Sequence, residues 1–416
     1  MAILNALYAQ SGGVTAVINA SACGVIQTAR LHPTKIGTVY AAQNGILGAL
    51  NEALINTEQE TDDNIAKLMH TPSGAFGSCR HKLSAEGAEL SRLIEVFRAH
   101  NIGYFFYNGG GDSQDTAAKV SDYSKKVGFP VTCVGIPKTI DNDLPFTDTC
   151  PGFGSVAKYV AISTKEASFD VASMAATSTK VFILEVMGRH AGWIAAAAGL
   201  AGNQAHEAPH IILFPEVAFD EARFMKKVSE SVRDYGYCVV VASEGIKNQQ
   251  GKFLSDGGLR DAFGHAQLGG VAPILAQLIK KELRFKYHWA VSDYLQRSAR
   301  HIASAVDLEQ AYALGKKAVD LALEGTSGVM PIIVREQDSP YRWSIDQVPL
   351  ADVANQEKEM PDNFIREDGM GITEACRAYL LPLIQGEAYP PYQNGMPDYV
   401  RMSSKLIPKR LPAWEG

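Results

Sequence analysis

Several features that would indicate metal, disulfide, membrane or nucleic-acid chemistry are missing from this sequence. Its six cysteines, at positions 23, 79, 133, 150, 238 and 376, form no CxxC pair and no zinc-binding spacing. We therefore expect reduced thiols in a cytoplasmic protein. No apolar run is long enough to span a membrane, and MAILNALYAQSGG lacks the basic stretch and cleavage site of a signal peptide. A formal charge of −6 gives no support to binding of nucleic acid or membrane surfaces.

Two nucleotide-binding motifs are absent or out of place. There is no GxxxxGK[ST] loop, which excludes a P-loop nucleotidase. GFGSVA, at 152–157, matches the GxGxxA fingerprint of dinucleotide-binding proteins, but it follows TDTCP rather than a strand. A nicotinamide-dependent oxidoreductase rests on this motif alone, and we interpret the match as a decoy.

The pattern of apolar runs predicts an α/β protein. With 416 residues the chain is too long for one ordinary core, so we expect two domains. Short β-rich runs alternate with helical stretches, which is typical of parallel sheets. The predicted strands are 3–10, 35–42, 103–107 and 130–136 in a first set and 181–186, 210–215 and 237–243 in a second. Beyond about residue 336 we expect irregular chain, wrapped on the body or partly mobile.

Almost every reactive side chain of the first 250 residues directly follows one of these strands. Ligands of parallel sheets bind at the carboxyl ends of the strands. The segments at that edge are Ser11–Gly13, Gly109–Ser113, Pro137–Asp143, Met187–Arg189 and Glu244.

Two of these segments are glycine loops that open onto predicted helices. Backbone amides at a helix N-terminus bind anions, phosphate above all, and glycine lets a ligand approach the backbone. SGG alone is equally typical of an ordinary tight turn. Its coincidence with GGGDS and PKTIDND favours a phosphate site.

PKTIDND combines a lysine, a threonine and two carboxylates. A carboxylate there could accept the proton of a sugar hydroxyl while Lys138 neutralises a transferring phosphoryl group. A solvated turn is the alternative interpretation, because Asp and Asn are common in turns. Arg80 and Arg297, taken singly, are typical of surface residues.

Taken together with these loops and arginines, the chain resembles the phosphofructokinase family from about Leu4 to Gly325. The matching motifs, in order, are SGG…N at 11–19, GSxR at 77–80, GGxxS at 109–113, P-x-TIDND at 137–143, EVMGR at 185–189, Glu244 and YLQR at 294–297. The resemblance implies a two-domain α/β fold of Rossmann-like parallel-sheet sandwiches with the active site in the interdomain cleft. It implies a phosphoryl-donor domain of residues 1–150 plus about 296–335, a sugar-phosphate domain of 151–295, and an extension of 336–416 packed on the body.

The resemblance also implies the phosphoryl donor. ATP-dependent members carry glycine at the places of Asp112 and Lys138, whereas aspartate and lysine mark the pyrophosphate-dependent members. A side chain at Asp112 would occupy and repel the α-phosphate of ATP, and Lys138 supplies a cation beside the leaving phosphate. The implied reaction is reversible phosphoryl transfer from pyrophosphate to the 1-hydroxyl of fructose 6-phosphate, with Mg²⁺ bridging phosphate oxygens.

Residue roles are carried over from the family position by position. Asp141 is the base, supported by Thr139, Asp143, Lys138 and Asp112, and Mg²⁺ is expected at Asp112 and Asp143. The residues expected at pyrophosphate are Gly12, Gly13, Arg80, Gly110, Gly111, Ser113 and Lys138. Those expected at the sugar phosphate are Thr139, Ile140, Asp141, Lys180, Met187, Gly188, Arg189, Glu244, Tyr294 and Arg297.

The chain departs from the family pattern at three places. Gly111 stands where a metal-binding aspartate is usual, and Lys180 and His288 stand where many members use arginines, often from a neighbouring subunit, to hold the 6-phosphate. The changed grip leaves room for sedoheptulose 7-phosphate as the sugar. An ATP-dependent enzyme and a sugar-phosphate sensor without catalysis remain as alternatives. By analogy we expect a homodimer or homotetramer.

Overall fold

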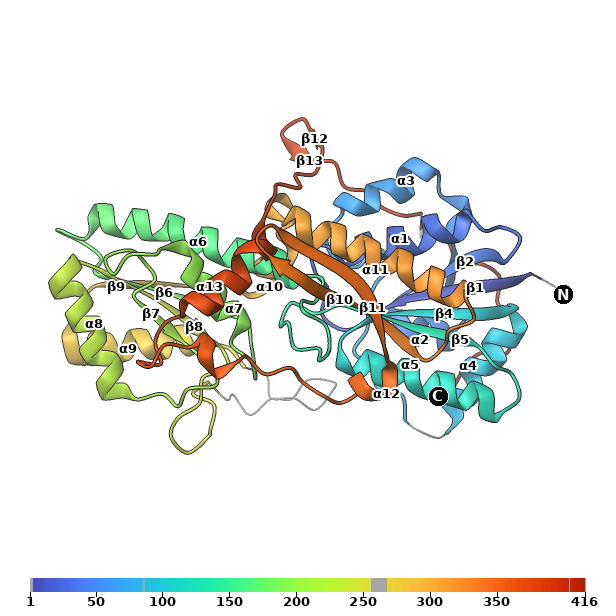
Figure 1. Cartoon of the computed structure of the whole chain (residues 1–416), viewed down its shortest axis with the longest axis horizontal. Coiled ribbons are helices and arrows are strands. Elements are labelled where there is room, and N and C mark those ends of the chain that lie inside the picture. The colour runs from blue at the N-terminus through green and yellow to red at the C-terminus, as the bar shows by residue number, and fades with distance from the viewer. Residues whose placement is uncertain (1–2, 85–86, 256–267, 404, 416) are drawn as a thin grey trace.

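The computed structural model describes residues 3–84, 87–255, 268–403 and 405–415. They form two α/β bodies placed end to end, each a mainly parallel sheet with helices on both faces (Figure 1). The expected α/β architecture with parallel sheets is confirmed. None of the described helices is long and apolar enough to cross a membrane.

The larger body is built on a seven-stranded sheet with the order β11-β10-β5-β4-β1-β2-β3. The pairs from β10 to β2 are parallel, whereas β3 and β11 are antiparallel edge strands. The strands are β1 Leu4–Gln10, β2 Ile36–Ala42, β3 Leu54–Asn56, β4 Ile102–Gly109, β5 Thr132–Pro137, β10 Val329–Asp338 and β11 Tyr341–Pro349.

Both faces of this sheet are apolar because alternate side chains of its strands enter two different cores. Ala6 and Tyr8 of β1 pack under α1 and α11, while Leu7 and Ala9 pack under α2, α4 and α5. The helices are α1 Ile18–Arg30, α2 Gly45–Leu50, α3 Asp62–Lys67, α4 Ala88–Ala99, α5 Gly111–Lys126, α11 Ala305–Leu323 and α12 Leu350–Val353, with short 3₁₀ turns at Thr57–Gln59 and Leu68–His70.

The smaller body has a four-stranded parallel sheet with the order β7-β8-β6-β9. One face packs against α6 and α7, and the other packs against α8 and α9. The elements are α6 Phe153–Met174, β6 Val181–Val186, α7 Trp193–Ala197, a 3₁₀ turn at Ala198–Ala201, β7 Ile211–Leu213, α8 Glu221–Tyr235, β8 Cys238–Ser243, α9 Val271–Leu283, β9 Tyr287–Val291, α10 Asp293–Ser298 and a 3₁₀ turn at Arg300–Ile302.

The expectation of irregular chain beyond residue 336 is wrong for β11, α12 and α13, whereas much of the described chain after Val353 has no regular structure. β11 pairs with β10 along its length as a sheet edge, and its half-exposed side chains mix polar and apolar types, which hid the strand pattern. The later elements are 3₁₀ turns at Asp362–Phe364 and Leu381–Ile384, α13 Glu374–Leu380, β12 Tyr392–Gln393 and β13 Met396–Pro397.

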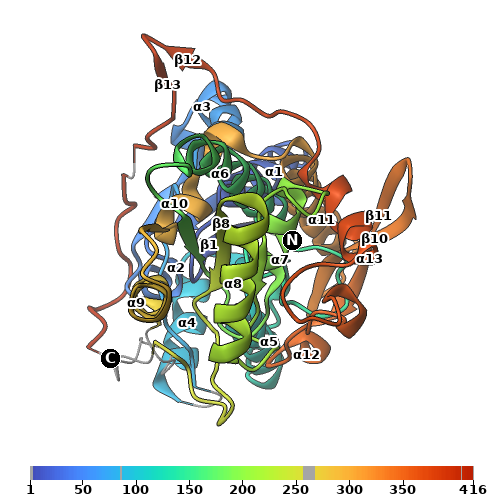
Figure 2. The ribbon, with the colours of Figure 1, turned by 90° about the vertical axis from the view of Figure 1, so that its left-hand side faces the viewer.

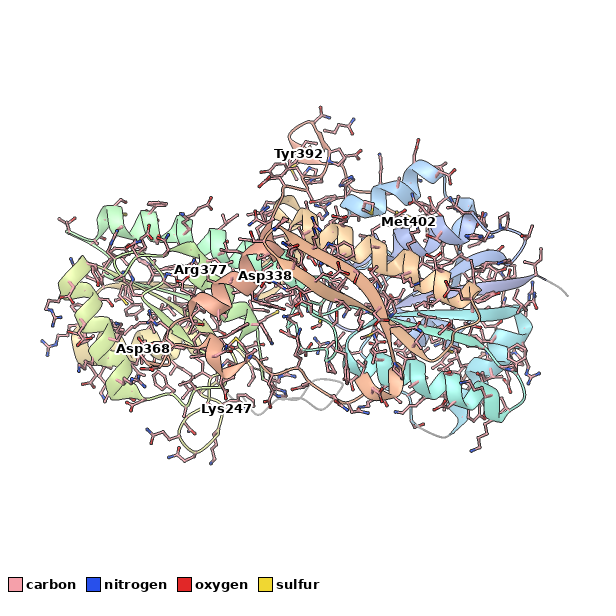
Figure 3. The ribbon with its side chains drawn as sticks, in the orientation of Figure 1. Lys247, Asp338, Asp368, Arg377, Tyr392 and Met402 are labelled. Carbon is pink, nitrogen blue, oxygen red and sulfur yellow. The ribbon has the colours of Figure 1, made fainter. Side chains whose placement is uncertain are left out.

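The C-terminal third connects the two bodies. Arg377 of α13 donates hydrogen bonds to the carbonyls of Gly199 and Gly202 in the smaller body (Figure 3). The chain then passes through the projecting β12–β13 hairpin and runs back along the larger body (Figure 2). There Leu406 forms a bridge with Ile55 of β3. The last quarter of the chain therefore contacts both bodies.

Candidate active site

A cavity of about 690 Å³ lies where the carboxyl ends of strands from both sheets meet. The lining includes every residue that the sequence placed in the site except Gly188 and Lys180. These lining residues are Gly12, Gly13, Arg80, Gly110, Gly111, Asp112, Ser113, Lys138, Thr139, Ile140, Asp141, Asp143, Met187, Arg189, Glu244, Tyr294 and Arg297.

One end of the cavity is strongly cationic. The Lys138 ammonium donates to the carbonyl of Gly13 at 2.5 Å, and it lies 3.4 Å from the position that a Cβ on Gly12 would take. A Cβ on Gly13 would lie 2.9 Å from Nη1 of Arg297 and 4.0 Å from Nη2 of Arg80. Burial, aided by the charge of Arg297, lowers the pKa of Lys138 to about 8. Three cations converging on bare backbone form a site for a compact polyanion.

The second glycine loop continues this anion site at the start of α5. Gly109 has a packing role, because a Cβ there would lie 2.0 Å from the hydroxyl of Ser113. Cβ atoms on Gly110 and Gly111 would meet nothing closer than 3.7 Å and 4.0 Å, so the space beside them is open. α5 begins at Gly111, and the N-terminus of a helix is a favourable place for an anion.

Asp112 is held by a lysine that sequence reasoning missed. Nζ of Lys82 donates to Oδ1 of Asp112 at 2.8 Å and to Oδ1 of Asn355 at 3.2 Å. The Asp112 carboxylate raises the pKa of Lys82. Lys82 is in a loop without periodic pattern, so only the tertiary structure reveals this partner.

The two carboxylates of the loop after β5 line the middle of the cavity. The amide of Asp141 donates to Oγ1 of Thr139 at 3.1 Å, and buried Asn142 adopts a left-handed φ of 55° between Asp141 and Asp143. Burial raises the pKa of Asp141, and the charges of Asp143 and Glu244 add to the effect. A carboxylate with a raised pKa is suited to accept a proton near neutral pH.

The turn after β6 supplies a further part of the cavity lining, which includes the cation Arg189. Gly188 has a φ of 130°, and a Cβ there would lie 2.9 Å from the carbonyl of Ala191. Gly188 therefore does not line the cavity itself but allows the turn that presents Met187 and Arg189. Burial raises the pKa of Glu244, opposed by the charge of Arg189.

The α10 helix supplies another part of the cavity wall. The guanidinium of Arg297 lies 4.0 Å above the ring of Tyr294. Gln296, which the sequence did not single out, accepts from the amide of Met187 at 3.2 Å. α10 thus contacts the β6 turn through Gln296 and places Arg297 beside Gly13.

Lys180 does not reach the cavity of its own chain. It precedes β6, whose opposite end carries Glu185 into the cavity, and six residues of strand span roughly 20 Å. Its ammonium donates to the carbonyl of Ala175. His288 pairs with Phe182 near the same remote end of β6 and is exposed.

The helix start in GFGSVA is already filled by the protein itself. Asp307 accepts from the amides of Gly152 and Ser155, both at 2.9 Å, and from the hydroxyl of Ser155 at 2.5 Å. This buried carboxylate occupies the anion position that a dinucleotide pyrophosphate would need. The geometry therefore rejects the oxidoreductase alternative.

The cavity also contains residues that the sequence did not indicate. They are Val14, Glu185, Val186, His190, Ala191, Leu268, Gly269, Val291, Asp293, Gln296 and Glu357. Across the described ranges, no three His, Cys, Asp or Glu side chains are close enough to hold a metal ion by themselves. Magnesium commonly binds through one or two carboxylates plus substrate phosphates, and Asp112 and Asp143 line the cavity in a way that fits this mode.

The family model described as Phosphofructokinase matches residues 5–322. A pyrophosphate–fructose 6-phosphate 1-phosphotransferase from Methylococcus capsulatus is 66% identical, with 99% of each chain covered. A relative with the same description from Halomonas elongata is 62% identical, with 100% of each chain covered. The crystal structure of a pyrophosphate-dependent phosphofructokinase from Marinobacter aquaeolei is similar with a TM-score of 0.92 at 62% identity, covering 99% of each chain.

Proposed function

The chain belongs to the phosphofructokinase family, and from that premise we propose the reaction that its cavity performs. It transfers a phosphoryl group from pyrophosphate to the 1-hydroxyl of D-fructose 6-phosphate and releases D-fructose 1,6-bisphosphate and phosphate. The observation that carries this proposal is the convergence of Lys138, Arg80 and Arg297 on Gly13 in the cavity that Asp141 also lines. The proposed pyrophosphate site and the proposed base therefore lie in the same cavity.

Asp141 is the base in this proposal. Its carboxylate takes the proton of the sugar 1-hydroxyl as that oxygen attacks the transferred phosphorus. Lys138 neutralises charge on the phosphate that leaves, and Thr139 supports the loop through the amide of Asp141. Met187, Arg189, Glu244 and Tyr294 line the rest of the cavity and hold the sugar phosphate.

The donor end is suited to pyrophosphate rather than ATP. Asp112 stands at the first turn of α5 beside the open backbone of Gly110 and Gly111, where a longer donor would extend. Nζ of Lys82 donates a hydrogen bond to the Asp112 carboxylate at 2.8 Å. This side chain limits the length of the donor by occupying space.

We propose Asp112 and Asp143 as the protein ligands of Mg²⁺, together with phosphate oxygens and water. Bound there, magnesium would neutralise negative charge on the phosphate groups. Gly111 contributes no carboxylate, and a Cβ there would have only the carbonyl of Gln356 at 4.0 Å. We further propose that residues 1–150 and about 296–335 form the phosphoryl-donor domain, that 151–295 form the sugar-phosphate domain, and that the extension 336–416 adds β11 to the edge of the donor-domain sheet. From the cysteine pattern we propose a cytoplasmic location.

We propose that the protein assembles as a homodimer or homotetramer through the edge strand β9. An unpaired strand edge can accept a second chain, and β9 carries exposed Trp289 and Val291. Lys180 and His288 lie at this side of the smaller sheet, remote from their own cavity. In an assembly they could reach the 6-phosphate in a neighbouring subunit.

The test is a comparison of donors. The purified protein is incubated with Mg²⁺ and fructose 6-phosphate, either pyrophosphate or ATP is added, and fructose 1,6-bisphosphate is followed. Product with pyrophosphate alone is expected. Product with ATP alone would contradict the donor argument, and no product with either would contradict the proposed reaction and turn the test to sedoheptulose 7-phosphate.

A further inference from the structure

Lys358 forms hydrogen bonds to the loop after β5 that carries Asp141 and Asp143, although it lies more than two hundred residues later in the sequence. Its ammonium donates to Oδ1 of Asn142 at 3.2 Å and to the carbonyls of Thr147 at 3.1 Å and Asp148 at 2.9 Å. Its backbone amide donates to the carbonyl of Asp143 at 2.6 Å. All four bonds end on the same loop.

The hydrogen bonds of Lys358 affect the orientation of Asp141 and Asp143 through Asn142, which lies between them. Its left-handed φ of 55° is uncommon for a residue with a side chain and needs support from its surroundings. The buried amide group also accepts from the amide of Cys150 at 3.0 Å and donates to the hydroxyl of Tyr379 at 2.9 Å. Lys358 completes this set as the charged donor to Asn142 among the described residues.

Because Asp141 and Asp143 flank Asn142, a change in the Asn142 backbone would turn both of these carboxylates. We propose, on the basis of the function proposed above, that Lys358 is a positioning residue of the phosphoryl transfer. It fixes the turn at Asn142 and so holds Asp141 and Asp143 toward the transferred group. Lys358 does not line the cavity, so it acts through the loop and not on substrate.

The segment that ends at Lys358 is anchored at its other end to the donor side. The Asn355 side chain donates to Oδ1 of Asp115 in α5 at 3.2 Å and accepts from Lys82 at 3.2 Å. Residues 355–358 therefore connect the start of α5 with the catalytic loop. This connection fixes the position of Asp141 relative to the start of α5. A displacement of a catalytic group by about 1 Å can reduce a rate by roughly 100-fold.

The experiment replaces Lys358 by Met, which keeps side-chain length and the backbone bond to Asp143 but removes the ammonium. We expect kcat to fall roughly 10- to 100-fold in both reaction directions. The KM values for pyrophosphate and fructose 6-phosphate should change far less than kcat. Lys358→Arg should recover part of the loss because a cation returns. Lys358→Gln is measured as a second neutral variant. If Lys358→Met does not fold, Lys358→Gln carries the test and should show the same loss of kcat.

Lys158→Met is the matched control. Lys158 is also buried, donates to the carbonyl of Gly386 at 2.6 Å, and does not line the cavity. Its variant should lose thermal stability but keep kcat. The inference is overturned if Lys358→Gln keeps kcat, or if Lys158→Met loses as much kcat as Lys358→Met. Absence of turnover in the unmodified protein would instead contradict the proposed function.

Discussion

One added methyl group at Gly13 should remove much of the enzyme's efficiency with pyrophosphate. The Cβ of Gly13→Ala would lie 2.9 Å from Nη1 of Arg297, closer than real Cβ contacts, so the guanidinium must move away. Arg297 is the end of a flexible side chain, and the fold should tolerate this shift. A hydrogen bond to a charged group contributes about 1.5–3 kcal/mol. Its loss corresponds to a fall of about 10- to 150-fold in kcat/KM.

The assay measures kcat/KM for pyrophosphate and for fructose 6-phosphate separately, together with the melting temperature. Gly128→Ala is the control, because nothing lies within 4 Å of its added Cβ and Gly128 does not line the cavity; its left-handed φ of 68° should cost stability but leave both kcat/KM values unchanged. A fall confined to fructose 6-phosphate would assign Arg297 to the sugar end alone. Gly13→Ala with unchanged kcat/KM for both substrates would refute the argument that Arg297 serves the donor end.

Three further predictions concern the reaction itself. Asp141→Asn should lower kcat about 10²- to 10⁴-fold with an unchanged circular-dichroism spectrum, and near-normal turnover would reject Asp141 as the base. Asp112→Gly should not produce an efficient ATP enzyme, which steady-state kinetics with ATP will check. Burial lowers the pKa of Lys138 to about 8, and its cationic form exists below that pKa. The kcat/KM for pyrophosphate should therefore decline as pH rises above this value, and Lys138→Arg should lack the decline.

The sequence was sufficient to place the residues that end buried strands. Asp112 and Lys138 follow β4 and β5, whose apolar side chains are almost completely buried. Such strands are recognisable from composition alone, and parallel strands bring their carboxyl ends to one edge. The position of a side chain within a few residues of that edge was therefore predictable without knowledge of the tertiary structure.

Residues that support the site from polar, non-periodic segments were not predictable in this way. Lys82 and Lys358 follow no strand, and each depends on a partner that is distant in sequence, Asp112 and Asn142 respectively. The helix α6 was also missed, because its first residues were interpreted only as a dinucleotide motif. β11 was missed since an edge strand need not show an alternating pattern.

The pair of Lys82 and Asp112 changes the physical account of donor choice. Charge repulsion of ATP by Asp112 is weakened when an ammonium lies 2.8 Å from its carboxylate. The pair is partly exposed, with 43% and 30% of the two side chains accessible, so it contributes little to stability but orients Asp112. Exclusion of ATP then rests mainly on occupied space. Asp112→Gly would clear that space, but the Lys138 side chain would still fill the cavity beside Gly12 and Gly13, and this is why that single change should not convert the enzyme.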